Sequence, residues 1–262
     1  MLKRNAGESL ETIDFPEENR VTPTWWNGSG NLRRGTNLFP CPICRTGEGE
    51  GVNRFCPECR RELHRIPAPH CRGCGGELDG VLAVCSKCLA APPRPWIGAA
   101  SVFEYRDLAR KVLHDFKFHN FPELARPLGE LAAEVMREEN FRADLVVPVP
   151  LHYTRLFLRS YNQAGLFAAV TAKHLGIPFA DALKRIKRGR RQSSLNREAR
   201  HRNPAGAFAV RHPERIAGKR ILLVDDIFTT GATLTAAANA LLTADSGPVF
   251  VLTAARTPRY SR

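Results

Sequence analysis

The sequence predicts an α/β protein with a mostly parallel sheet and helices on both faces, preceded by a small cysteine-rich module. Two observations lead to this fold class. Short apolar runs alternate with amphipathic helical stretches along the C-terminal two thirds of the chain, which is typical of parallel strands joined by helices. All eight cysteines lie between Cys41 and Cys88. A length of 262 residues also suits one main domain with a small appendage.

Composition divides the chain into four parts. Residues 1–36 are polar with little apolar periodicity, which favours a disordered leader. We expect the cysteine-rich module at 37–92, the α/β domain at 93–256 and a short tail at 257–262. The sequence has no apolar run of the length of a signal peptide core or a membrane helix, so we expect a cytoplasmic protein without membrane insertion. The formal net charge of +13 indicates acidic partners, either phosphorylated small molecules or nucleic acid.

The cysteines form four CxxC pairs, which favours metal binding over disulfides in a cytoplasmic protein. The pairs are Cys41 and Cys44, Cys56 and Cys59, Cys71 and Cys74, and Cys85 and Cys88. Two such turns present four thiolates to one tetrahedral zinc ion. Sequential pairing gives two structural zinc ions, and an interleaved pairing is the alternative. His64 and His70 lie between the pairs, where each is either a replacement ligand or, more commonly, a surface residue.

The basic residues around these pairs leave two roles open for the module. They are Arg60, Arg61, Arg65, Arg72 and Lys87. A cluster of this kind can hold the phosphates of a nucleic acid. The module can equally act as a folding staple that also caps the α/β domain, and this is the interpretation that we favour.

The α/β domain is expected to begin after the proline-rich joint at 91–95. A strand pair or strand-turn is predicted at 97–105. Apolar residues at helical spacing then predict a helix from about Leu108 that ends near Lys117, and a second helix from Pro122 to about Glu139. Further strands are expected at 144–150, 177–182, 207–210, 220–224 and 249–254, and further helices at 161–175 and 233–243. Ligands of such sheets bind beyond the carboxyl ends of the strands.

The run from Ile221 to Leu234 carries the most specific chemistry. A β-branched strand ends at Asp225 and Asp226, and a helix follows the next turn. Backbone N–H groups at a helix start favour a phosphate, and hydroxyl side chains add donors. The turn consists of Thr229, Thr230, Gly231, Ala232 and Thr233. Because carboxylates do not serve a phosphate, the two aspartates need sugar hydroxyls or hydrated Mg²⁺ as partners. The run lacks the Gly-Lys-Ser/Thr of a nucleoside triphosphate P-loop.

Two basic segments are candidates for completing an anion site. The loop at 150–163 contains Arg155 and Arg159, which either hold an anion or make surface ion pairs. The segment 184–202 is rich in arginine and lysine against the single acid Glu198, which favours a mobile lid that closes over an anionic substrate. A nucleic-acid patch or a solvated charge run is the alternative.

Together the segments resemble the ComF family of competence-associated, phosphoribosyltransferase-like proteins. The resemblance covers about residues 39–256 and includes the CxxC pairs, VLHDFKFHN, DLVVPVPLH and ILLVDDIFTTGATL. The last stretch is similar to the motif of type I phosphoribosyltransferases that binds 5-phosphoribosyl 1-pyrophosphate (PRPP). The resemblance therefore implies a type I phosphoribosyltransferase-like domain behind an N-terminal double zinc ribbon.

The resemblance also implies roles for individual residues. Asp225 and Asp226 would hold the ribose hydroxyls directly or through Mg²⁺, and residues 229–233 would hold the 5-phosphate. Arg159, with neighbouring loop amides, would hold the pyrophosphate as a third catalytic position. Lys117 and Arg155 would add binding contacts, although Lys117 also fits an ordinary lysine at a helix end.

The expected function is Mg²⁺-dependent transfer of a phosphoribosyl group to an unknown acceptor, linked to natural transformation and DNA uptake. Enzymes acting on 6-oxopurines normally have an acid at the place of Thr229, so such purines are not the expected acceptor. The alternative is a non-catalytic module that binds single-stranded DNA, a competence helicase or another DNA-uptake protein.

Overall fold

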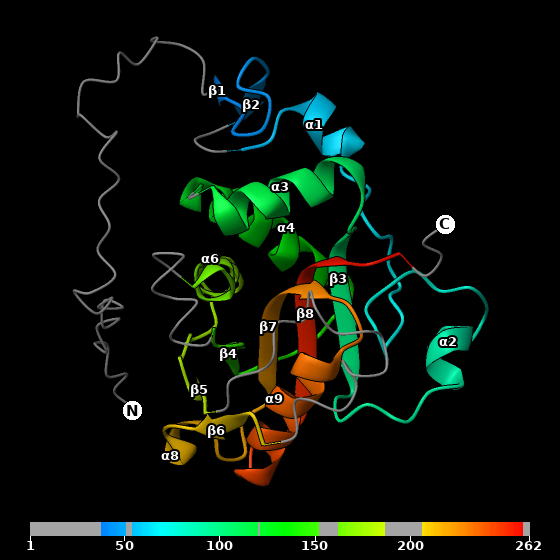
Figure 1. Cartoon of the computed structure of the whole chain (residues 1–262), viewed down its shortest axis with the longest axis vertical. Coiled ribbons are helices and arrows are strands. Elements are labelled where there is room, and N and C mark those ends of the chain that lie inside the picture. The colour runs from blue at the N-terminus through cyan, green and yellow to red at the C-terminus, as the bar shows by residue number, and fades with distance from the viewer. Residues whose placement is uncertain (1–37, 51–53, 120, 152–161, 187–205, 259–262) are drawn as a thin grey trace, which may run out of the picture. The chain divides into compact units, whose positions relative to one another are not determined.

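The computed structural model describes residues 38–50, 54–119, 121–151, 162–186 and 206–258 of the chain. A four-stranded parallel sheet lies at its centre (Figure 1). The strands are β3 (Gly98–Glu104), β4 (Leu145–Pro148), β7 (Ile221–Phe228) and β8 (Val249–Arg256). Their order in the sheet is β3-β8-β7-β4. This arrangement confirms the predicted α/β class with its parallel sheet.

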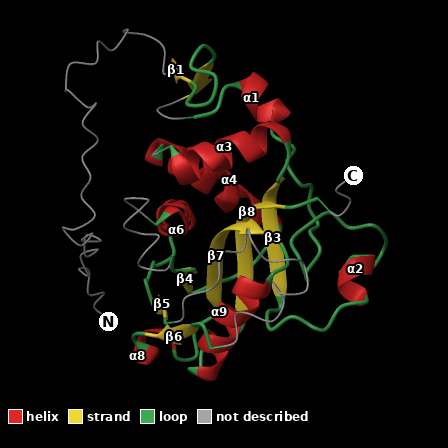
Figure 2. Cartoon of the chain, viewed as in Figure 1, coloured by secondary structure: helices red, strands yellow, loops and turns green. Residues whose placement is uncertain are grey.

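Helices cover both faces of this sheet (Figure 2). On one face lie α3 (Asp107–Phe118), α4 (Ala125–Glu138) and α6 (Gln163–Leu175), with the short 3₁₀ turn η2 (Pro122–Leu124) before α4. On the other face lies α9 (Ala232–Thr243). Gly176 ends α6 in the left-handed conformation that glycine commonly adopts after a helix. None of the described helices is long and apolar enough to span a membrane.

Alternation along β7 assigns its side chains to the two faces. Leu222 and Val224 pack into the core under α3, α4 and α6, whereas Ile221 and Leu223 pack into the core against α9. All four side chains are fully buried. A strand buried on both faces reads as an unbroken apolar run in the sequence, which is why this strand was recognisable.

One expectation about a strand was wrong. Residues 177–182 form only an isolated bridge, in which Phe179 lies parallel to Val146. Proline at 178 has no N–H to donate, and the chain instead pairs as β5 (Leu183–Arg185) with β6 (Phe208–Val210), antiparallel and outside the main sheet. Of the two alternatives for residues 97–105, the structure has one strand, β3, followed by a bend at 105–106, and these residues form no strand pair. The short helix α8 (Pro213–Ile216) follows β6.

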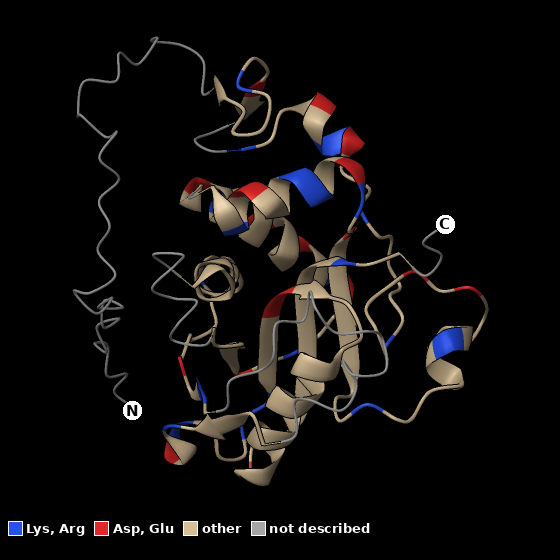
Figure 3. Cartoon of the chain, viewed as in Figure 1, with Lys and Arg blue, Asp and Glu red and all other residues tan. Residues whose placement is uncertain are grey.

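Strand β7 is also longer than predicted. It continues through both aspartates to Phe228, because β8 runs beside it as far as Arg256 and pairs with it residue by residue. Asp225 therefore lies opposite Thr253 within the ladder. The two acids are part of the strand near its carboxyl end, and Figure 3 shows them as an acidic segment on β7.

The cysteine-rich module contains β1 (Leu38–Pro40), β2 (Glu48–Glu50), α1 (Pro57–Glu62) and α2 (Ser86–Leu89). Between its two halves, residues 64–66 run antiparallel along the outer edge of β3. Ile66 donates its backbone N–H to Val102, and Glu104 donates to the carbonyl of His64. The module thus covers a sheet edge that would otherwise carry unpaired backbone groups.

Arginines of the module pair with a row of glutamates on α4. The glutamates recur every four residues, so they lie on one helix face. The pairs are Arg54–Glu130 at 3.0 Å, Arg60–Glu134 at 2.9 Å and Arg65–Glu138 at 2.7 Å. Each partly exposed pair contributes little to stability by itself. Because Arg60 and Arg65 already have carboxylate partners, this geometry supports the staple over the nucleic-acid ribbon.

His70 is neither a cysteine substitute nor a surface residue, contrary to both readings of the sequence. Its side chain is fully buried, and Glu139, at the end of α4, is 8% exposed. The ring Nδ1 lies 2.7 Å from Glu139 Oε1, and Nε2 lies 3.1 Å from the carbonyl oxygen of Ser101 on β3. The backbone N–H of His70 donates to the same carboxylate at 2.9 Å. This buried contact joins the module to the α/β domain.

We expect Glu139→Ala to lower the free energy of unfolding by roughly 2–5 kcal/mol, because it leaves buried donors of His70 without an acceptor. Glu138→Ala is the matched control. It breaks the exposed contact with Arg65 and should cost less than about 1 kcal/mol. Urea unfolding of both variants measures the difference, and equal losses would contradict this role of His70.

Candidate functional site

The two aspartates of β7 point to opposite faces of the sheet, because neighbouring residues of a strand alternate. Asp226 shares its face with α3, and Lys117, in the last turn of that helix, reaches it. Lys117 Nζ lies 2.8 Å from Asp226 Oδ2, with both side chains less than one fifth exposed. Lys117 therefore contacts an acid at the carboxyl edge of the sheet, where ligands of parallel sheets bind.

Asp225 lies on the opposite side, toward β5 and α9. Its Oδ1 accepts the backbone N–H of Asp226 at 2.9 Å. Burial raises the pKa of Asp225 to about 7, and the neighbouring charge of Asp226 acts in the same direction. This rise in pKa is opposed by the hydrogen bond from the Asp226 N–H and by the positive charges of Lys117 and Arg185. The carboxyl of Asp225 is thus partly protonated near neutral pH, and a bound cation would favour its ionised form.

The turn after β7 leads directly into the helix start that the sequence predicted. Gly231 is the N-cap of α9 and adopts a left-handed φ of 77°. A Cβ at this position would lie 2.7 Å from the ring of Phe228, so both the conformation and the space require glycine. Ala232 N–H lies 3.4 Å from the hydroxyl oxygen of Thr230. The first amides of α9 are those that a helix leaves without intrahelical acceptors.

Arg94 is a site residue that the sequence analysis missed. It comes from the proline-rich joint and donates to the carbonyl of Thr230 at 3.0 Å. Its guanidinium lies 5.6 Å from the ring of Trp96 and 6.0 Å from that of Phe228. The contact joins residues 136 positions apart, so local sequence gives no signal for it. Arg94 places a positive charge against the turn and fixes one of its carbonyls.

Other predicted residues lie outside the described part of the chain. They include Arg155, Arg159 and positions 187–202 of the expected lid, so their roles stay predictions. The first two basic residues of that segment, Lys184 and Arg185, are described, and they lie in strand β5, paired with β6, rather than in a mobile lid. The guanidinium of Arg185 lies 5.3 Å from the ring of Phe208.

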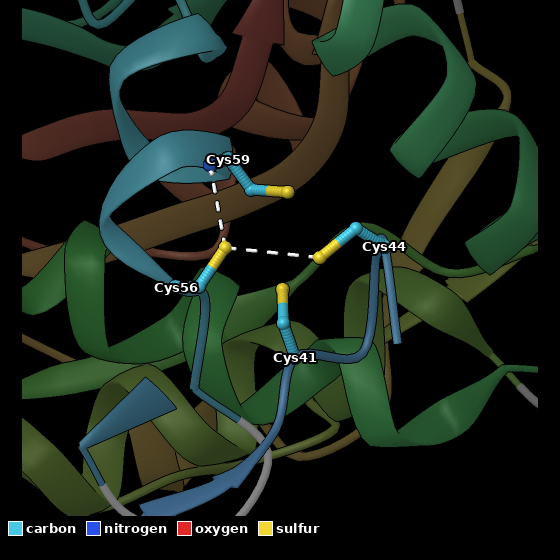
Figure 4. A group of neighbouring side chains, drawn as sticks. All are labelled: Cys41, Cys44, Cys56 and Cys59. Atoms are coloured by element: carbon cyan, nitrogen blue, oxygen red, sulfur yellow. Dashed lines mark hydrogen bonds between the residues drawn. The ribbon is translucent and has the colours of Figure 1, made fainter. Parts of the chain in front are cut away.

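The eight cysteines gather in two groups of four, each built from consecutive CxxC pairs. Figure 4 shows the first group, Cys41, Cys44, Cys56 and Cys59. The Sγ atoms within each group lie within 4.8 Å of one another. This confirms sequential pairing and excludes the interleaved alternative. The 3.7 Å between Cys44 Sγ and Cys56 Sγ is far longer than a disulfide bond of roughly 2.05 Å. None of the eight cysteines forms a disulfide bond.

The surroundings of the sulfur atoms fit a metal. Gly47 N–H lies 3.2 Å from Cys44 Sγ, and Cys85 N–H lies 3.2 Å from Cys71 Sγ. The backbone amides of Gly47 and Thr46 lower the pKa of Cys44 to about 6, which favours the thiolate that metals require, whereas burial raises the pKa of Cys56 and Cys59 in the same group. Gly47 and its counterpart Gly73 leave room for the sulfur atoms, since a Cβ would lie 2.6 Å and 2.9 Å from them. Each group could bind one zinc ion in a closed tetrahedral site.

Comparison with known proteins agrees with these features. Residues 162–257 match the phosphoribosyl transferase domain. Competence protein F of Haemophilus influenzae is 30% identical over 203 residues, which is 75% of this chain and 87% of the relative. DNA utilization protein YhgH of Escherichia coli K12 is 29% identical over 223 residues, covering 83% and 96%. Competence protein ComFC of Bacillus subtilis is 28% identical over 198 residues, covering 72% and 78%.

The parallel sheet, the matched domain and the two cysteine groups define a phosphoribosyltransferase-type α/β protein with an N-terminal Cys₄ module. Similarity to the competence proteins over 75% and 72% of the chain narrows this class. The chain belongs to the ComF family.

Gly73→Ala should weaken metal retention in the second cysteine group, because the new Cβ would lie 2.9 Å from Cys88 Sγ. Gly80→Ala is the control, since a Cβ there meets nothing within 4 Å. We expect faster zinc release to a chelator, and a lower Tm, for Gly73→Ala alone. Equal release rates for the two variants would contradict a close-packed metal site.

Asp225→Asn should become stabilising relative to the wild type as pH rises. The carboxyl has its ordinary pKa near 3.8 when unfolded and about 7 when folded, so the folded state binds more protons between these values. Wild-type stability therefore falls through this window by up to about 1.4 kcal/mol per pH unit, and the variant lacks this loss. Urea unfolding of both proteins from pH 5 to 8 gives the difference. A pH-independent difference would contradict the raised pKa.

Proposed function

We propose that the chain binds PRPP with Mg²⁺ and transfers the phosphoribosyl group to an acceptor. The observation that supports this best is the arrangement at the carboxyl end of β7. Two acids precede a glycine-capped helix start, and a lysine from another helix reaches the second acid. Donors for a phosphate and acceptors for sugar hydroxyls are thus placed one after the other along the chain.

The helix-start turn would hold the 5-phosphate. The first amides of α9 and the hydroxyls of Thr229, Thr230 and Thr233 supply donors, and the helix dipole favours the negative charge. Arg94 adds a cation beside this turn through its contact with Thr230. Its stacking against Trp96 and Phe228 limits the motion of the guanidinium.

Asp225 and Asp226 would hold the ribose hydroxyls or Mg²⁺, which prefers oxygen ligands. When bound, Mg²⁺ supplies positive charge that neutralises the pyrophosphate. Asp226 must exchange Lys117 for its new partner, and we expect the released ammonium to turn to the pyrophosphate. Arg159 and Arg155 would complete that part of the site, as the family resemblance implies.

The reaction needs no covalent enzyme nucleophile. The bond from C1 of the ribose to the pyrophosphate oxygen breaks, both electrons leave with the pyrophosphate, and the acceptor forms the new bond at C1. The protein would contribute by neutralising the departing charge and by orienting the acceptor.

We further propose two structural zinc ions in a module at 37–92, which staples the transferase domain at 93–256. A role in natural transformation is supported by the relatives named competence protein F and DNA utilization protein. The net charge of +13 suits an alternative in which the chain binds single-stranded DNA or a helicase partner without catalysis.

Calorimetric titration with PRPP and Mg²⁺ tests the proposal. We expect Asp226→Asn to weaken binding at least about tenfold, a loss of roughly 1.4 kcal/mol, because it removes the charge that a cation or hydroxyl needs. Asp245→Asn removes an exposed acid beyond the other end of α9 and is the matched control. Pyrophosphate release with candidate acceptors then reports turnover.

Two results would contradict the proposal. One is the absence of PRPP binding, and the other is binding that Asp226→Asn leaves unchanged. Single-stranded DNA binding with a steep salt dependence, unaffected by Asp226→Asn but weakened when Arg188, Arg190 and Arg191 are neutralised, would instead support the alternative.

A further inference from the structure

Three side chains with metal-ligating atoms gather at the C-terminal end of α3, apart from the cysteine groups. They are His114, Asp115 and His119, and their ligand atoms lie within 4.8 Å of one another. Among the described residues, this is the only such group that contains no cysteine. Neither the transferase site nor the cysteine module uses it.

Two ligand atoms of this group already lie about as far apart as two ligands of one metal ion. Asp115 and His119 lie four positions apart, so they share a helix face. His119 Nδ1 is hydrogen-bonded to Asp115 Oδ1 at 2.8 Å, and an ion bound between the two atoms would replace this hydrogen bond. Ligands held at 2.0–2.1 Å around one ion lie roughly 3 Å apart, so these two atoms can bind an ion with little movement.

His114 supplies the third ligand. Its ring centroid lies 5.1 Å from that of His119 and 4.8 Å from that of Phe118. The ring of Phe118 therefore limits the positions that His114 takes up and keeps it beside His119. A small rotation of an exposed imidazole is enough to bring its nitrogen to the ion.

The group is open to solvent on the side of the histidines. His119 is 55% exposed and Asp115 is 27% exposed. An ion can enter directly, and its remaining coordination positions stay available to water or an anion. The nearby cation Lys111, four positions before Asp115 on the same helix, reduces affinity for a second positive charge.

We propose that His114, Asp115 and His119 form a third metal site, for a divalent ion that prefers imidazole. Two imidazoles and one carboxylate favour Zn²⁺, Ni²⁺, Co²⁺ or Cu²⁺ over Mg²⁺ and Ca²⁺, which require oxygen ligands. This ligand set also differs from the four thiolates of each cysteine group. The site therefore binds Ni²⁺ without displacing zinc from sulfur ligands.

Titration of the zinc-loaded full chain with Ni²⁺ alone tests the site. We expect one Ni²⁺ per chain with zinc content unchanged, and at least about tenfold weaker binding in the double variant His114→Ala with His119→Ala. The nickel X-ray absorption edge should show nitrogen and oxygen donors without sulfur. Because both side chains are exposed, the variant should keep the wild-type circular dichroism and Tm.

His212→Ala is the matched control. His212 is an exposed histidine whose Nδ1 lies 3.3 Å from the Glu214 carboxylate, outside the α3 group, and its removal should leave Ni²⁺ binding unchanged. The proposal is overturned if the chain takes up no Ni²⁺, if binding survives in the double variant, or if sulfur ligands appear. None of these readouts depends on PRPP binding, so the transferase proposal and this one fail separately.

Discussion

The alternation of side chains along one buried strand determines the arrangement of the candidate site. Residues 221–224 are buried on both sides, so the face of every following residue on β7 is fixed by the packing of the sheet. Asp226 must face α3, and Asp225 must face β5 and α9. Lys117 consequently makes its ion pair with Asp226, whereas Asp225, adjacent in sequence, lies within the electrostatic influence of both Lys117 and Arg185. A shift of one residue in strand register would turn Asp226 away from Lys117.

The cysteine module depends on the same sheet. Its first group packs into the core beneath α3 and α4, and its second packs into the core that contains α9. Residues 64–66 connect the two groups along the edge of β3. The module therefore spans both faces of the α/β domain around one edge, which accounts for its row of arginine contacts with α4 and for the burial of His70.

Sequence patterns predicted those features that depend on residues close together in the chain. Apolar periodicity located α3, α4, α6 and α9, and CxxC spacing located both cysteine groups. Other features arise from contacts between distant segments, and no local pattern records them. His70 is buried because Glu139 and Ser101 supply acceptors, Arg94 reaches the turn across the fold, and β7 extends past its apolar run because β8 pairs with it.

Because residues 64–66 cover the outer edge of β3, the α/β domain should behave differently once the cysteine-rich module is removed. A fragment beginning after residue 92 would present the outer backbone of β3 to solvent over a strand of seven residues, most of them apolar. Such an edge is a template for pairing with a second copy, so the isolated α/β fragment would tend to aggregate rather than remain monomeric. If the cysteine groups hold zinc as proposed, removal of the zinc would loosen the module and expose the same edge.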